Sequence, residues 1–481
     1  MMERQRQAIR SIVEEVQGYL EVLTPVHIGS GIKWQRNLDF VVDAEGTYIV
    51  PESALIRYLQ AHPEAIDRLE DEREREDLLW EVEDGIEYIL PCESREILVF
   101  IRDGNGYPFV PGASLKGAIR TMLFRYFWDQ LSPQKQADLL RNTQPRREWA
   151  AQPLLKEVFG KDPNHDLMRV LAVRDVQVRQ QDLDLYRVFV LRLTDPEGKH
   201  YDWRGMRRRR TFSVIYAEML RPGTTASFSM RLDRFLLEDE RARSELHFDR
   251  KAFDFAKLAR WANAYARKRL QRELAFLEKC NDGALNGLLN SLDALLQRIP
   301  DESDPEAGQR FLLRLGWGSG WQSMTGDYLE GEWLEKIRKR YRLNYDDRQR
   351  GRAHFPIFPK TRKIVFDGDR PAYLSGWVQI WLGKRPPADT RVTETQQVPA
   401  VEATPTVSTA PSLPKGLETG TIHSLNLKKM YGKVQPDKGG EPIRFDFQDA
   451  VMAGLEKGVR VSYRTVERGG ELRAVEVKRY G

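Results

Sequence analysis

The first residues whose side chains could take part in binding or catalysis follow a strand-like run near the N-terminus. The sequence places His27, Gly29 and Ser30 in a turn, followed by Lys33 and Trp34. Glycine lets backbone N–H groups approach an anion closely, and a histidine here could hydrogen-bond a phosphate or act as a general base. A lysine beside a tryptophan offers a phosphate contact next to a surface for base stacking. A histidine after a strand can equally be structural, so both interpretations stay open.

A second candidate anion site lies where a Pro-Gly turn enters a helical pattern. Ser114 is expected as the N-cap, and Lys116 and Arg120 are four residues apart on one helix face, with Gly117 between them. A helix N-terminus with two cations on one face can bind an anion. The spacing is not that of a Walker loop. A capped helix with solvated cations would give the same pattern.

A glycine-rich, aromatic loop follows a strand-like run near residue 315. It contains Gly316, Trp317, Gly318, Gly320 and Trp321. One interpretation is a flexible aromatic loop that contacts RNA. The other is a tight turn whose tryptophans anchor in the core.

The sequence lacks the usual patterns of a metal-dependent nuclease. There is no HExxH, no pair of closely spaced cysteines and no clustered Asp-x-Asp. Cys92 and Cys280 cannot by themselves form a disulfide framework or a zinc site, which favours a reducing cytosol. Cleavage without metal needs a base beside cations, which His27, Lys33 and Lys116 would supply only if folding joins them. We predict no metal and no cofactor, and leave catalysis undecided, with His27 as the weak candidate.

Charge is segregated along the chain although its total nearly balances. The sequence has 76 Lys+Arg against 71 Asp+Glu, a net charge of +5. Residues 64–87 carry twelve acids against three arginines, and residues 333–363 carry eleven bases against three acids. An arginine cluster supplies three further candidate RNA contacts, namely Arg207, Arg208 and Arg209. Such segregation suits a subunit that contacts protein neighbours and a polyanion, although solvated helix faces also produce charge runs.

The elements that must position these residues are mixed. Strand and hairpin patterns at 18–26, 37–51 and 211–233 alternate with helical patterns at 114–128 and 251–297. This mixture predicts an α+β fold rather than a doubly wound parallel sheet. No apolar run approaches the length of a membrane span, so we expect no membrane contact and a cytoplasmic protein.

The last hundred residues differ from the rest of the chain in composition and in strand pattern. Residues 386–415 are rich in Pro, Thr, Ala and Val and contain no aromatic residue, which predicts a flexible linker. Residues 416–481 regain five short strand patterns. Strands of that number and spacing are typical of a small closed barrel of the OB type.

Four stretches resemble, in the same order, RAMP-superfamily proteins of CRISPR systems. They are LTPVHIGSG (23–31), PFVPGASLKGAIRTMLF (108–124), VFGKDPNHDLMRVLAVRD (158–175) and LRLGWGSGW (313–321). The sequence is most similar to the fifth-subunit family of type III-A (Csm) effector complexes, over about residues 17–380. The resemblance implies two ferredoxin-like (RRM-like) modules with helical insertions, which we divide at residues 1–245 and 246–385. It also implies guide-RNA contacts at His27, Gly29, Ser30, Lys116, Arg120 and the loop 316–320.

The tail resembles a cold-shock domain that has lost most of its aromatic positions. Ser424 and Leu425 stand where a Trp-Phe pair is expected, and Tyr431 and Phe447 keep ring positions. Each lost stacking contact removes about 1–3 kcal/mol of binding free energy. We therefore expect a barrel that binds RNA weakly or docks a protein.

Together these features predict a non-catalytic RNA-binding subunit. By resemblance it would bind CRISPR RNA (crRNA) toward its 3′ end, cap the effector backbone and support crRNA maturation in antiviral defence. Its partners would be crRNA, other RAMP subunits and a host nuclease that trims the guide. Two alternatives stay open, namely a metal-independent RAMP endoribonuclease with His27 as base, and a protein adaptor that recruits the trimming nuclease.

Overall fold

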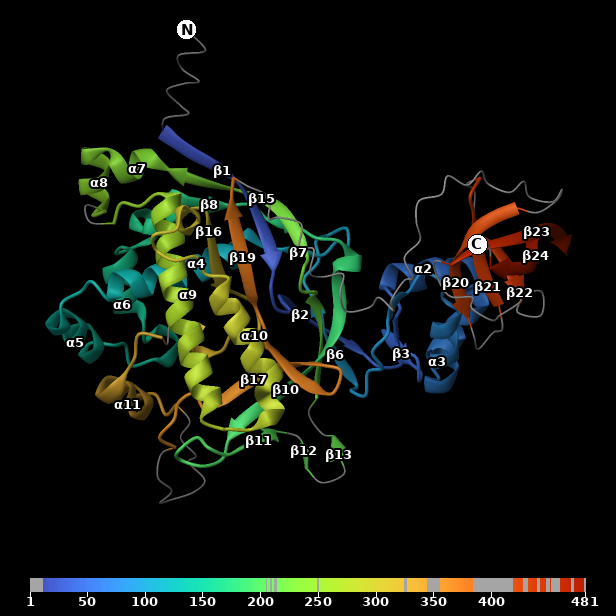
Figure 1. The fold of residues 1–481 in the computed structure, drawn as a ribbon, viewed down its shortest axis with the longest axis horizontal. Helices are drawn as coiled ribbons and strands as arrows, with labels where there is room; N and C mark the ends of the chain where they lie inside the picture. Colours follow the sequence, from blue (N-terminus) through green and yellow to red (C-terminus); the bar gives the residue numbers. More distant parts are fainter. Residues whose placement is uncertain are drawn as a thin grey trace, which may run out of the picture. The chain divides into compact units, whose positions relative to one another are not determined.

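The structure of the protein is a computed structural model in which the chain forms two compact units, residues 1–395 and 396–481 (Figure 1). The predicted linker at 386–415 lies outside the described residues. The residues that the structure describes are 12–204, 206–207, 210–211, 214–248, 251–323, 327–343, 355–383, 418–426, 431–438, 442–446, 450, 459–468 and 471–479.

The first sheet of the large unit, sheet A, has five strands. Their spatial order is β16 (Arg310–Arg314), β19 (Trp377–Leu382), β1 (Val13–Val22), β15 (Thr225–Asp233) and β8 (Leu171–Val173). All neighbouring strands run antiparallel. Several helices lie in the chain between β1 and β8, and several more between β15 and β19.

The second sheet, sheet B, has a path of six strands and one side branch. The path runs β18 (Arg370–Leu374), β17 (Thr361–Asp367), β10 (Leu183–Leu193), β14 (Ile215–Leu220), β6 (Glu96–Phe100) and β2 (Gly29–Gln35), and β11 (Tyr201–Arg204) pairs with the far end of β10. Both sheets contain strands from residues 1–245 and from residues 246–385. The two predicted modules are therefore interleaved in space.

Helices cover these sheets and enclose the main cores. They are α4 (Gly112–Trp128), α5 (Pro133–Arg141), α6 (Gln152–Phe159), α7 (Arg234–Glu238), α8 (Glu240–Leu246), α9 (Phe255–Glu278), α10 (Asn286–Gln297) and α11 (Gly331–Arg340). The apolar stripe of α9 is buried, as its 3.6-residue period requires. Its first half packs in a core with α4 and sheet A, and its second half packs in a core with α10 and sheet B (Figure 1).

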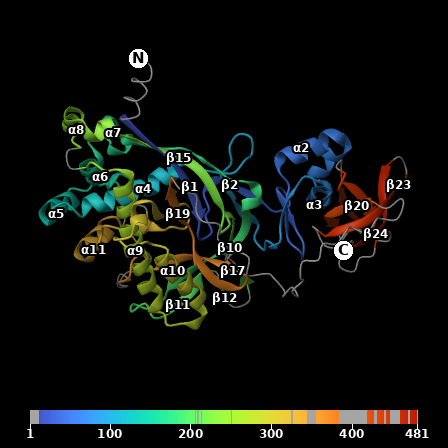
Figure 2. The same cartoon turned by 45° about the horizontal axis from the view of Figure 1, so that its top comes forward.

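The acidic segment belongs to a small lobe inserted between β2 and β6. The lobe consists of β3 (Phe40–Val42), β4 (Thr47–Ile49), α2 (Glu52–Ala61), α3 (Glu72–Glu81) and β5 (Ile86–Tyr88). It has its own small apolar core. Figure 2 shows α2 and α3 standing apart from α4 and α9 of the same unit. Asp71 caps α3 by accepting from two backbone N–H groups.

The C-terminal unit confirms the prediction of a small five-stranded barrel. Its strands β20 (Glu418–Asn426), β21 (Tyr431–Pro436), β22 (Ile443–Asp446), β24 (Glu471–Arg479) and β23 (Arg460–Arg468) close in that order. Buried Ile422, Val434, Phe445 and Tyr463 help fill the interior. The large unit likewise confirms a mixed α+β body. Within the part of the chain that the structure describes, no helix is long and apolar enough to cross a membrane.

Candidate RNA interface

The loop between β1 and β2 is fixed by main-chain contacts with distant segments. The N–H of Trp377 donates to Thr24 Oγ1 at 3.0 Å, and Val26 pairs with Leu220. The chain therefore enters β2 in one defined direction. Gly29 is exposed at the start of β2, and Ser30 Oγ donates to the Val99 carbonyl at 3.2 Å.

His27 is buried at the base of this loop. It is 2% exposed, and its Nδ1 lies 2.6 Å from the Glu218 carbonyl oxygen. A carbonyl can only accept, so Nδ1 carries the proton of a neutral ring. Burial lowers the pKa of His27, which keeps the ring neutral. The edges of Phe100 and Trp317 meet the ring, so its position supports the loop.

A buried carboxylate, that of Glu218, stabilises the same region. Glu218 accepts from Arg102 Nη1 at 2.8 Å and Nη2 at 2.7 Å, and from the Tyr88 hydroxyl at 2.6 Å. Arg102 also lies over the Trp34 ring, 5.2 Å from its centroid. Trp34 is therefore already engaged by a guanidinium. Its neighbour Lys33 forms an exposed ion pair on the same strand pair.

That ion pair joins Lys33 Nζ to Glu96 Oε2 at 2.6 Å. The hydrogen bond from Lys33 lowers the pKa of Glu96. Because both side chains are about half exposed, an incoming phosphate can compete for the lysine at small energetic cost.

The glycine-rich loop packs directly against the His27 loop. Trp317 N–H donates to the His27 carbonyl at 2.8 Å. Gly316 has φ +78°, and a Cβ there would lie 2.4 Å from the same carbonyl oxygen. Gly318 has φ +93°, and a Cβ there would lie 2.3 Å from Ser375 Oγ. Only glycine permits both the left-handed backbone and the close approach.

The two tryptophans of this loop are partly buried anchors. Trp317 packs on sheet B, and Trp321 packs against the main core with its ring 4.9 Å from that of Phe358. Gly320 between them is exposed, with nothing near its Cβ position. The tight-turn interpretation therefore describes the packing of both rings, while part of each ring still reaches the surface.

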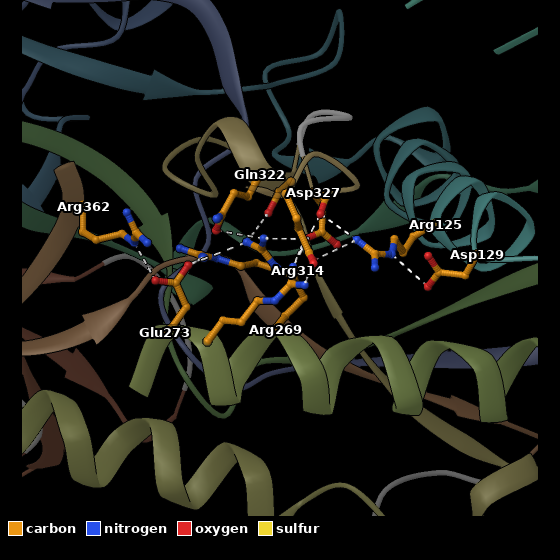
Figure 3. Close-up of polar contacts among 11 residues, drawn as sticks. Arg125, Asp129, Arg269, Glu273, Arg314, Gln322, Asp327 and Arg362 are labelled. Carbon is orange, nitrogen blue, oxygen red and sulfur yellow. Dashed lines mark hydrogen bonds and ion pairs between the residues drawn. The ribbon is translucent and has the colours of Figure 1, made fainter. Parts of the chain in front are cut away.

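A buried ionic network holds the first end of this loop (Figure 3). Glu273 Oε2 accepts from Arg362 Nε at 2.5 Å, and Glu273 Oε1 lies 3.6 Å from Arg269 and 3.5 Å from Arg314. These three arginines lower the pKa of Glu273 against the opposing effect of its burial. Burial lowers the pKa of Arg314 to about 10, so it stays charged at neutral pH. Arg314 Nε also donates to the Ser375 carbonyl at 2.9 Å.

The same network holds the far side of the loop. Arg269 Nη1 donates to Gln322 Oε1 at 3.0 Å and lies 3.4 Å from Asp327 Oδ1. Asp327 also pairs with Arg272 at 2.7 Å, and its carbonyl accepts from Arg125 at 2.7 Å (Figure 3). The loop is thus clamped on both sides by charges from α4, α9 and β17.

One face of sheet B presents aromatic rings beside a cation. Tyr186, Tyr373 and Trp317 pack, partly exposed, on the same small apolar cluster. Lys363 Nζ lies 4.1 Å from the centroid of the Trp317 ring, and burial lowers the lysine pKa. Lys363 forms no ion pair with any residue that the structure describes. Half-exposed rings next to an unpaired cation can stack bases and contact a phosphate.

The sequence alone did not single out Lys363 or the two tyrosines as site residues. Lys363 is the last residue of the basic segment 333–363, but a charge run does not show which of its members faces the tryptophan. The alternation of side chains along the strand could have placed Lys363 on this face. Lys363 and Val365 point to the face opposite Ile364 and Phe366.

The second predicted anion site lies around α4. The helix begins at Gly112 with Pro111 as its N-cap, so Ser114 lies in the first turn and its prediction as N-cap is wrong. The chain enters from an extended segment, and Pro111 supplies the fixed φ there. Arg120 and Lys116 line an open pocket, while Gly117 is exposed on the helix.

The predicted site residues thus form two groups and several separate positions. The His27 loop and the glycine-rich loop meet, with Lys33 and Trp34 further along β2, whereas Lys116, Gly117 and Arg120 belong to α4. Among the remaining predicted contacts, Arg207 lies in β12 (Met206–Arg207) and Tyr431 in β21, and Arg208, Arg209 and Phe447 lie outside the described residues. The described residues hold no group of three or more His, Cys, Asp or Glu side chains that could bind a metal ion.

Comparison with known proteins agrees with this architecture. The family model of the RAMP superfamily matches residues 19–323, more than half of the chain. The protein therefore belongs to the RAMP superfamily. No curated protein matches the sequence.

Solved structures extend the comparison. A chain of the Csm–crRNA–target RNA ternary complex of a type III-A CRISPR-Cas system is 19% identical with a TM-score of 0.50, covering 76% of this chain and 100% of that chain. Csm5 of T. onnurineus is 20% identical with a TM-score of 0.49, covering 75% and 99%. Drosophila Unr CSD456 is 21% identical with a TM-score of 0.12, covering 14% and 27%. The likeness to the ternary-complex chain shows a shared fold.

Proposed function

We propose that the protein is the RNA-binding fifth subunit of a type III-A effector complex. In this proposal it binds crRNA toward the 3′ end, caps the backbone of RAMP subunits and supports crRNA maturation in antiviral defence. Family membership supports the RAMP assignment, and the ternary-complex chain of similar fold comes from an assembly that holds crRNA. The two-module ferredoxin-like description and the cytoplasmic location belong to the same proposal.

The observation that carries the proposal is the aromatic face of sheet B. Trp317, Tyr186 and Tyr373 place partly exposed rings on one cluster, and Lys363 stands unpaired among the described residues over the tryptophan. Stacking and a backbone phosphate contact bind single-stranded RNA without strict sequence readout. This is the recognition that a guide of variable sequence requires.

A binding experiment on the purified full chain tests this proposal. Tyr373→Leu and Lys363→Ala should each weaken binding of a labelled single-stranded RNA about tenfold, because each removes one stacking or phosphate contact. Lys363→Ala should also reduce the slope of log affinity against log salt by about 0.7. Fluorescence anisotropy across a salt series measures both quantities.

The matched control is Lys135→Ala. Lys135 is an exposed lysine of α5 that is paired with Glu157 at 3.1 Å, and it belongs to no predicted contact. Its substitution should leave affinity and salt slope unchanged. Equal RNA affinity of the wild type and the Tyr373 and Lys363 variants would refute binding through this face.

The separate barrel supports a second role for the tail. It closes on its own core and is a compact unit distinct from residues 1–395. We propose that it docks a protein partner, such as the nuclease that trims the guide. Deletion of residues 386–481 should leave assembly intact and guides untrimmed. His27 is 2% exposed and its Nδ1 is engaged by the Glu218 carbonyl, which argues against its serving as the base of an endoribonuclease.

A further inference from the structure

An open pocket of about 610 Å³ lies beside α4. Three elements contribute to it, namely α4, α6 and the loop 160–169. Its charged lining residues are Lys116, Arg120, Lys156, Lys161, Arg169, Asp162 and Asp166. Five cations against two carboxylates leave a surplus of three positive charges, which converge on one space rather than spreading along a stripe.

Arg120 is held ready for a ligand. Its Nη1 donates to both carboxylate oxygens of Asp166 at 2.9 Å, and its guanidinium lies 3.8 Å from the centroid of the Phe159 ring. Its Nε and Nη2 have no hydrogen-bond partner within the described part of the chain. Asp166 also accepts from Met168 N–H, which ties the arginine to the loop. The orientation of the free donors is therefore set before a ligand arrives.

The pocket also contains three lysines. Lys116, Lys156 and Lys161 form no ion pair with any residue in the described ranges. Lys116 is partly buried, and this burial lowers its pKa, with the nearby Arg120 charge adding to the effect and Asp166 opposing it. Holding a partly desolvated, unpaired ammonium group beside a guanidinium is unfavourable until an anion enters. An anion that enters the pocket would therefore be stabilised by these charges.

We infer that this pocket binds the phosphorylated end of an RNA strand. An internal phosphodiester carries one negative charge, whereas a terminal phosphate carries about 1.5 to 2 at pH 7. Three uncompensated positive charges around one space match the terminal group better. Leu155 and Met168 also line the pocket and offer apolar surface to the terminal sugar or base.

The inference deepens the proposed function and rests on it, because it concerns the end of an RNA whose body would contact sheet B. Gly160 shapes the pocket on the loop side. It has φ +130°, and a Cβ there would lie 1.9 Å from the His165 carbonyl oxygen. The loop can therefore fold back toward α4 only with glycine at this position.

Oligonucleotide binding to the purified full chain tests the pocket. Three labelled RNAs of one sequence carry a 5′-phosphate, a 3′-phosphate or no terminal phosphate, and their affinities are compared by fluorescence anisotropy with an internal label. Wild type should bind one phosphorylated RNA about tenfold more tightly than the unphosphorylated one, as expected for a charge-assisted contact. The preferred phosphate shows which end enters.

Variants assign that preference to the pocket. Lys161→Ala and Lys156→Ala, two lysines of the pocket lining, should abolish the preference while leaving affinity for unphosphorylated RNA nearly unchanged. Lys336→Ala, an exposed lysine paired with Glu332 at 2.6 Å on α11, is the matched control and should retain the preference. Lys363→Ala should weaken the binding of all three RNAs equally and should therefore retain the preference for the phosphorylated RNA.

The contrary outcomes are distinct. Equal binding of all three RNAs by wild type would overturn the pocket inference and leave RNA binding through sheet B intact. Binding of free AMP as tight as that of the phosphorylated RNA would overturn assignment to a strand end. Failure of every RNA to bind would instead refute the proposed function.

Discussion

Beneath the loop from Gly316 to Trp321, arginines lie buried around Glu273, whereas the pocket lysines beside α4 are partly or fully exposed and form no ion pair with a residue that the structure describes. The side chains of Arg269 and Glu273 are each 3% exposed, but those of Arg120 and Asp166 are 32% and 26% exposed. Buried ions are held by one another in a fixed geometry, and removing one leaves others uncompensated. Exposed ions contribute little to the free energy of unfolding and remain available to a ligand.

This difference separates two uses of positive charge. Under the loop, charge fixes the backbone so that Trp317 lies over sheet B beside Lys363. In the pocket, charge is available for binding. The comparison predicts that substitutions in the first region act on stability and those in the second act on ligand affinity.

The largest expected effect is that of Glu273→Gln. Loss of this carboxylate leaves three neighbouring arginines without their shared counter-ion and should lower the free energy of unfolding by about 3–5 kcal/mol. The matched substitution in the pocket is Asp166→Asn, which should lower it by less than about 1 kcal/mol. Urea denaturation followed by tryptophan fluorescence measures both. Equal losses in the two variants would show that the contrast in burial has no energetic meaning.

A smaller effect is expected for Gly316→Ala. The alanine would adopt a left-handed backbone, at about 1–2 kcal/mol, and its Cβ would press on the His27 carbonyl, so we expect a total of about 2–3 kcal/mol. Gly320→Ala is the control, because Gly320 shares the positive φ but has nothing near its Cβ. It should lose only the backbone part. The difference in thermal midpoint isolates the close approach between the loops, and identical midpoints would argue against it.

The smallest effect is that of Lys363→Met. Burial lowers the pKa of Lys363, so the charged lysine destabilises the fold below that pKa, and this penalty disappears as pH rises toward 10.5. The variant should therefore be more stable than wild type at pH 7, by about 0.5 kcal/mol, and this advantage should shrink as the pH is raised. Denaturation at pH 7 and pH 10 checks the sign. An advantage that grows with pH would contradict the assignment.

Much of the fold was accessible from local patterns. The five barrel strands, the helix through Lys116 and Arg120, and the glycine-rich turn after β16 all follow from alternation, helical period and turn residues. The N-cap at Ser114 was wrong because a serine near a helix start is a general preference, and here Pro111 precedes a helix that begins at Gly112. The interleaving of both sheets was not visible, since strand partners lie far apart in the chain.

By itself, the sequence determined which local structures form and where chemically able residues occur, because backbone propensity and side-chain period act over a few residues. Tertiary structure alone decided that His27 and Trp317 meet, that Lys363 lies over the tryptophan, and that Glu273 gathers three arginines. Such contacts depend on strand register and helix packing between distant segments. Their energies come from burial and low dielectric, which exist only once the chain has folded.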